Sequence, residues 1–183
     1  KHGTLKNTIS YGIPRWQVYF GKLIVSTIVT AFCGIVIFGV FLLSAFLVSP
    51  MTGQSGLVAK WFWIYLGGAI PLWVSGISLA IMLFSILRSS TAASFIYAGI
   101  LAVLGPIVQL LEYYVSDIFA SVYAWLPMAV FDNWGSHLMY SDITQIDTVI
   151  SSGLFAHSWA TGVLWIFGTC LIGYLVFRKK EIK

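Results

Sequence analysis

Four long apolar stretches decide what this chain can fold into. They span residues 23–48, 61–87, 92–111 and 157–177, and none of them contains Asp, Glu, Lys or Arg. Each reaches the roughly 20 residues that a helix needs to cross a bilayer core. The stretches are continuously apolar rather than alternating, which disfavours a lipid-facing β-barrel. Because backbone groups in lipid must bond within helices, the predicted fold is all-α: a polytopic helical membrane protein with four transmembrane helices.

The composition agrees with this prediction and excludes several functions. Only 9% of the residues are charged, whereas soluble domains carry about 25%. A disordered chain and an ordinary cytosolic enzyme are therefore excluded. Ten Lys and Arg residues are too few for a surface that follows phosphates, so no nucleic-acid partner is expected. Cys33 and Cys170 both lie inside apolar runs, which predicts no disulfide framework.

The positions of the basic residues predict the orientation in the membrane. If the N-terminal segment is cytoplasmic, nine of the ten Lys and Arg residues lie inside and Lys60 alone lies outside. Residues 1–22 and the basic tail, residues 178–183, then lie in the cytoplasm. Residues 112–156 form an extracellular segment. We therefore expect one transmembrane domain, residues 1–183, with both termini in the cytoplasm.

Residues 1–22 precede the first span and read as a short amphipathic helix followed by a break. Leu5 and Ile9 share one helical face, and Gly12 is a natural helix end. Pro14 can open a second helix that enters the membrane, because its missing amide costs nothing there. The residues expected as interface anchors are Trp16, Tyr19 and Lys22. A simple amphipathic anchor on anionic lipid is the alternative.

The extracellular segment, residues 112–156, contains apolar residues at helical spacing. These residues are Ile118, Phe119, Val122, Trp125 and Leu126. Pro127 interrupts the pattern, so the segment is short and broken for a full span. We predict that residues 112–131 dip into the outer leaflet and return as a re-entrant helix segment. A helix lying flat on the membrane is the alternative. Residues 132–150 read as a polar loop, with Trp134 at the headgroups.

Two further patterns concern helix shape and packing. Pro71 and Pro106 lie inside apolar stretches, where each removes an amide donor and predicts a kink. Pairs of small residues four apart permit close helix contact. The pairs are Gly76 with Ala80, Ala98 with Ala102, Ala156 with Ala160, and Ser158 with Gly162. We expect ordinary packing within the chain, and a dimer seam is the alternative.

The sequence lacks the usual energy-coupling motifs. Gly21-Lys22 has neither the upstream glycine nor the hydroxyl of a phosphate-binding loop, so the chain is not expected to hydrolyse ATP. Ionisable residues inside spans usually accompany ion coupling. Gln109 and Glu112 mark only the outer end of the third span. If the protein moves something, the energy is expected to come from another subunit.

No catalytic residue, metal site or cofactor is predicted. His137 and His157 lack metal-ligand spacing, and a loose cation site that includes Asp132 and Asp142 is the weaker alternative. Ser75 has no evident general base, which a serine nucleophile requires. Helix packing is the preferred role for this serine.

One local segment resembles a known family. Residues 3–22, GTLKNTISYGIPRWQVYFGK, are similar to the segment between the second and third membrane helices of bacterial ATP-binding-cassette (ABC) permeases of the type-2 exporter class. The likeness is greatest to Firmicute permeases related to bacitracin-resistance and lantibiotic-immunity transporters. The matching positions are Gly3, Leu5, Lys6, Asn7, Gly12, Arg15, Tyr19 and Lys22. The family has six spans, so on this scheme the chain contains the third to sixth and looks truncated.

The resemblance implies a permease subunit of an ATP-driven exporter in the bacterial plasma membrane. It would expel a hydrophobic or amphipathic substrate such as a peptide antibiotic. Its partners would be a cytoplasmic ATP-binding subunit and a second permease, as a homo- or heterodimer. Residues 1–12 would be the coupling helix. The apolar pattern and the break at Pro127 separately predict that residues 112–131 cap the outward end of the transport path. The implied docking residues are Leu5, Lys6, Asn7, Ser10, Gly12 and Arg15. The alternative is a non-transporting membrane scaffold or immunity protein that sequesters a peptide.

Overall fold

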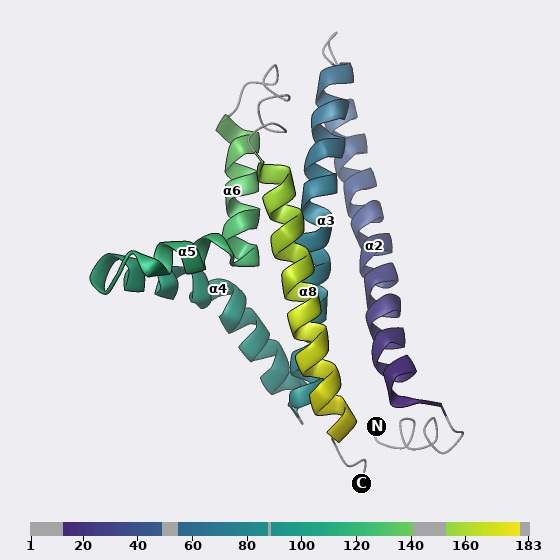
Figure 1. Ribbon diagram of the computed structural model, residues 1–183. Coiled ribbons are helices and arrows are strands. Elements are labelled where there is room, and N and C mark those ends of the chain that lie inside the picture. Colours follow the sequence, from purple (N-terminus) through teal and green to yellow (C-terminus); the bar gives the residue numbers. More distant parts are fainter. Residues whose placement is uncertain (1–12, 49–54, 88, 141–152, 180–183) are drawn as a thin grey trace.

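The protein is a bundle of helices. The computed structural model describes residues 13–48, 55–87, 89–140 and 153–179. The helices in chain order are α2 (Arg15–Val48), α3 (Ser55–Ile86), α4 (Ser90–Tyr114), α5 (Ile118–Ala124), α6 (Pro127–Tyr140) and α8 (Leu154–Lys179) (Figure 1). These described ranges contain no strand, so the predicted all-α fold is confirmed.

Four of the helices, α2, α3, α4 and α8, are long and apolar enough to cross a membrane, as predicted. The candidate spans are Arg15–Val40, Phe62–Ile86, Ser90–Tyr114 and Leu154–Lys179. The helices themselves extend beyond the apolar runs, and α3 already begins at Ser55. Apolarity marks the part of a helix that lipid can cover, whereas backbone hydrogen bonding continues into the polar flanks.

Pro14 sets the start of α2. Its carbonyl accepts hydrogen bonds from the amides of Gln17 at 3.0 Å and Val18 at 3.4 Å. Pro14 therefore lies just before the first helical residue, Arg15. The long helix predicted to run from this point into the membrane is continuous through Val48.

The ends of the helices lie at two opposite ends of the bundle. At the end that we call the base, α2 begins, α3 ends, α4 begins and α8 ends (Figure 1). At the opposite end, the top, α3 and α8 begin and α6 ends (Figure 1). The four long helices thus alternate in direction, as consecutive membrane spans must.

The central contact is between α3 and α8. A Cβ added at Gly162 of α8 would come 2.6 Å from the carbonyl carbon of Pro71 in α3, so only glycine permits this approach. Lower in the same seam, the buried hydroxyls of Ser78 and Thr169 are hydrogen-bonded at 2.6 Å. The small pair Ser158 and Gly162 is buried here, which confirms packing within the chain for this pair.

Pro71 also leaves one carbonyl of α3 without its helical donor. A proline inside a helix removes the amide that would bond to the carbonyl four residues earlier, which here belongs to Gly67. The indole Nε1 of Trp159 in α8 donates to that carbonyl at 3.1 Å. A side chain of α8 thus replaces the backbone bond that Pro71 removes.

The chain between α4 and α8 folds back on itself. Figure 1 shows α4 leaving the base obliquely, while its end projects sideways together with α5. The two helices pack closely, because a Cβ added at Gly105 would lie 3.7 Å from the ring of Tyr123. The predicted break occurs where expected: α5 ends at Ala124 and α6 begins at Pro127.

One prediction for this region is wrong. Residues 132–150 were expected to form a polar loop with Trp134 at the headgroups, but α6 continues to Tyr140 and Trp134 is buried. The reason is that Val130 and Trp134 lie four residues apart and extend one buried helical face. The loop prediction for residues 141–150 falls outside the described residues.

Replacing Gly162 by alanine should destabilise the fold. The added methyl group would collide with the Pro71 backbone, and overpacking of this kind costs about 1–3 kcal/mol. The matched control is Gly168→Ala on the same helix, where a Cβ meets nothing within 4 Å. We expect the midpoint of thermal unfolding in detergent to be lower for Gly162→Ala than for Gly168→Ala. Equal midpoints would contradict the close α3–α8 contact.

Candidate functional site

Arg15 is the one predicted docking residue that falls within the described part of the chain. Leu5, Lys6, Asn7, Ser10 and Gly12 lie outside it. The Arg15 guanidinium donates a hydrogen bond to the backbone carbonyl of Arg178, in the last turn of α8. The structure therefore joins the start of α2, three residues after the predicted coupling helix, to the end of α8.

Tyr19, expected as an interface anchor, lies inside the protein instead. Its side chain is 1% exposed and its ring packs against Tyr174 and Phe177 of α8, with centroids 6.3 and 6.0 Å apart. The hydroxyl occupies the space that a Cβ on Gly173 would need. Trp16, by contrast, is 51% exposed at the start of α2, where an anchor could face the lipid.

Lys22 completes the contact between α2 and α8. Its Nζ lies 5.8 Å from the ring centroid of Phe177, within cation–π range. With Arg15, two cations of α2 therefore lie at the C-terminal end of α8, where the helix dipole favours positive charge. We call this contact the foot; it consists of Arg15, Tyr19 and Lys22 of α2 with Gly173, Phe177 and Arg178 of α8.

Above the foot, α2 presents a mostly open apolar surface. Phe32, Ile35 and Ile37 are each exposed by about two thirds or more. Nearer the top, the ring of Phe38 meets that of Phe62 in α3, with centroids 5.2 Å apart. Lipid or another membrane helix could cover the exposed face.

The connection between α5 and α6, which we call the corner (residues 124–127), is held by two side chains of α8. The Nε1 of Trp165 donates to the carbonyl of Trp125 at 2.8 Å. The Nε2 of His157 is hydrogen-bonded to the carbonyl of Ala124 at 2.9 Å. These carbonyls lie at the end of α5, where a helix has no further amides to offer. The side chains of α8 therefore cap α5.

Trp134 holds α6 against α3. Its side chain is 2% exposed, and its Nε1 donates to the carbonyl of Tyr65 at 3.0 Å. The indole lies directly on Gly68, where a Cβ would overlap it. Phe155 of α8 borders the same ring, with centroids 6.2 Å apart. The glycine of α3 therefore creates the space for this tryptophan.

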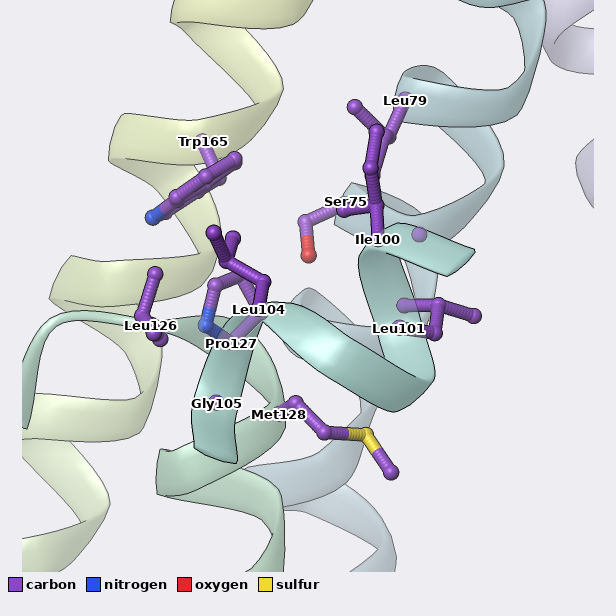
Figure 2. A pocket seen from close by; sticks show the side chains of 11 residues that line it. Ser75, Leu79, Ile100, Leu101, Leu104, Gly105, Leu126, Pro127, Met128 and Trp165 are labelled. Carbon is purple, nitrogen blue, oxygen red and sulfur yellow. The ribbon is translucent and has the colours of Figure 1, made fainter. Parts of the chain in front are cut away.

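A small cavity of about 40 Å³ lies beneath the corner, between α3, α4 and α8. Figure 2 shows Ser75, Leu104 and Pro127 around it, with Trp165 on the side of α8. Its walls are mostly apolar and it has room for a few small groups, not for a cargo molecule. Leu126 and Pro127 of the corner line this cavity, so the other lining residues show how far the corner lies from the ends of the spans. Ser75 lies near the middle of the candidate span of α3, and Trp165 near the middle of that of α8.

The described residues contain no group of three or more His, Cys, Asp and Glu that could hold a metal ion. Of the weaker cation-site alternative, Asp132 is exposed and His157 binds the carbonyl of Ala124. The side chain of His137 and all of Asp142 fall outside the described structure. Ser75 is buried, and its hydroxyl donates to the carbonyl of Leu72 within α3.

Sequence reasoning missed the polar contacts of α8. His157, Trp159 and Trp165 each bind a backbone carbonyl of a neighbouring helix or of the corner. One signal was available for Trp159, because Pro71 had to leave a carbonyl in need of a donor. No comparable signal in the sequence identified the partners of His157 and Trp165.

Comparison with known proteins assigns the chain to a family. Residues 1–182 match the family described as ABC-2 family transporter protein. No match was found among curated proteins or among solved structures. Members of the family are transport subunits rather than catalytic ones, and they work with an ATP-binding partner. With four apolar helices long enough to span a membrane, this multi-pass membrane protein belongs to the ABC-2 transporter family and is a permease component of an ABC transporter.

Proposed function

We propose that this permease is the membrane subunit of an ATP-driven exporter in the bacterial plasma membrane, with its base in the cytoplasm. The family supports the transporter role, and the charges support the orientation. Arg15, Lys22, Arg178 and Lys179 lie at the base, whereas Lys60 lies near the start of α3 at the top. Such an excess of Lys and Arg is typical of the cytoplasmic side.

The observation that carries the proposal is the position of Arg15. Residues 1–12 are proposed as the coupling helix that docks on the ATP-binding subunit, through Leu5, Lys6, Asn7, Ser10, Gly12 and Arg15. Pro14 follows that segment in the sequence, and Arg15 begins α2. The hydrogen bond from Arg15 to the Arg178 carbonyl means that a subunit bound here would act on the first and last described helices together.

The proposed cargo is a hydrophobic or amphipathic peptide. This rests on the similarity of residues 3–22 to permeases of bacitracin resistance and lantibiotic immunity. Two permease subunits, identical or different, would enclose the path. The exposed small pairs Ala98 with Ala102 and Ala156 with Ala160 leave room for close contact with a second subunit.

We also propose that α5 and the start of α6 form the re-entrant cap over the outer end of the transport path. The support is the depth of the corner, since Pro127 borders the same cavity as Ser75 and Trp165, both near mid-span. A helix lying flat on the membrane would meet only the ends of α3 and α8, whereas the corner contacts α8 from His157 in its first turn to Trp165 near its middle.

Replacing Lys6, Asn7 and Arg15 together should release the ATP-binding subunit. Truncations at the centre of an interface commonly cost about 2 kcal/mol or more, so co-purification should fall at least tenfold. Because Arg15 also belongs to the foot, a Lys6/Asn7 double variant is compared with the triple variant. Lys60→Ala at the top serves as the control and should retain the subunit. Full recovery of the subunit with both multiple variants would contradict the docking assignment.

Cells that carry the permease and its ATP-binding subunit should grow at higher bacitracin or lantibiotic concentrations than cells without them. Disabling the catalytic residue of the ATP-binding subunit should abolish this protection, because export requires hydrolysis. Protection that survives intact would instead support sequestration of the peptide. Membrane levels of the permease are measured in parallel, so that poor expression is recognised.

The cap predicts a pattern of cysteine labelling in a Cys33→Ser/Cys170→Ser background. Single cysteines placed from Phe119 to Val122 should be protected from an aqueous maleimide, because lipid and protein surround them. A cysteine at Asp142 should react. Uniform labelling across residues 113–145 would refute the re-entrant arrangement and favour a helix at the surface.

A further inference from the structure

The foot joins two helices that are far apart in the sequence. Tyr19 is enclosed by α8, and a Cβ at Gly173 would also lie 3.2 Å from the Cα of Met82 in α3. The tyrosine hydroxyl thus fills a notch that exists only because residue 173 is a glycine. Arg15 on one side and Lys22 on the other bind the end of α8. A displacement of the start of α2 cannot leave α8 behind without breaking these contacts.

The same helix holds the corner in its upper half. α8 runs from Leu154 to Lys179 without an internal proline, and at 1.5 Å per residue it is about 39 Å long. Its side chains His157 and Trp165 bind the carbonyls of Ala124 and Trp125. One continuous helix therefore makes contact with the start of α2 at the base and, through His157 in its first turn and Trp165 near its middle, with the α5–α6 corner.

We propose that α8 is the relay of this permease: the foot passes movement of the start of α2 to α8, and His157 and Trp165 pass it to the corner. Tyr19 is the positioning residue of the relay, since its ring packs against Tyr174 and Phe177 and so fixes the register between α2 and α8. The proposal rests on the proposed function, in which an ATP-binding subunit acts on the segment before α2. It adds the route by which that action reaches the proposed cap.

Gly173→Ala separates the two helices at one defined point. The new Cβ meets the Tyr19 hydroxyl and should push the tyrosine out of its notch. Combining it with Tyr19→Phe removes the hydroxyl and with it most of the collision. The matched control on α8 is Gly168→Ala, which has nothing within 4 Å of its added Cβ. Removing the Tyr19 hydroxyl relieves the collision at this notch alone, so recovery in the double variant ties the effect of Gly173→Ala to the contact between Tyr19 and Gly173.

The experiment places a nitroxide at the exposed Asp117, immediately before α5 and outside the protected positions 119–122, as Asp117→Cys in a Cys33→Ser/Cys170→Ser background. The permease and its ATP-binding subunit are co-purified into lipid nanodiscs. The spectrum of the label is recorded without nucleotide and after trapping with ATP and vanadate. The relay predicts a spectral change on trapping, reduced about fivefold or more in Gly173→Ala, as for a lost allosteric coupling. The Gly173→Ala/Tyr19→Phe and Gly168→Ala variants should retain the change.

The outcomes separate the relay from the function on which it rests. Loss of the ATP-binding subunit from the unaltered permease would overturn the proposed function itself. With that subunit bound, a label that does not respond to trapping would overturn the relay. A full response in Gly173→Ala, or a lost response that Tyr19→Phe does not restore, would overturn it as well.

Discussion

Every backbone carbonyl inside a membrane needs a donor from the protein, because the hydrocarbon core offers no water. Pro71 in α3 and the end of α5 at Ala124 are two places where carbonyls lack a helical donor. The donors that serve these sites all come from α8: Trp159 on one side, and His157 and Trp165 on another. The bonds hold α3 and the corner on different faces of α8, and the other described helices are arranged around this core.

Close approach of α3 and α8 makes those bonds possible. In lipid, helices gain little from apolar contact alone and associate through small residues and hydrogen bonds. Here Gly162 lies on the backbone of Pro71, and Ser78 pairs with Thr169 in the same seam. Gly68 serves a related purpose, because it opens the space that the indole of Trp134 fills. Glycine thus decides where large aromatic side chains can enter the bundle.

The arrangement suits a subunit that is moved by a partner rather than one that carries out chemistry. The described residues that bear charge lie at the base or in the segment from α4 to α6, apart from Lys60. Several interior hydroxyls, indoles and one imidazole bind the backbone or one another. An ABC permease needs helices that shift as units, and the foot and the corner attach two such units to one continuous helix.

The sequence by itself determined the all-α class, the four spans and the break at Pro127. A long apolar run must form a helix to cross the membrane, and a proline removes a backbone donor wherever it stands, so both effects can be read locally. It did not determine which helix covers which face. Helical periodicity identifies a face, but it does not name the neighbour against which that face packs. Tyrosine and tryptophan suit the membrane interface and a protein interior equally well, since both combine an apolar ring with one polar atom. Only the tertiary structure therefore placed Tyr19 and Trp134 inside and gave His157 and Trp165 their carbonyl partners.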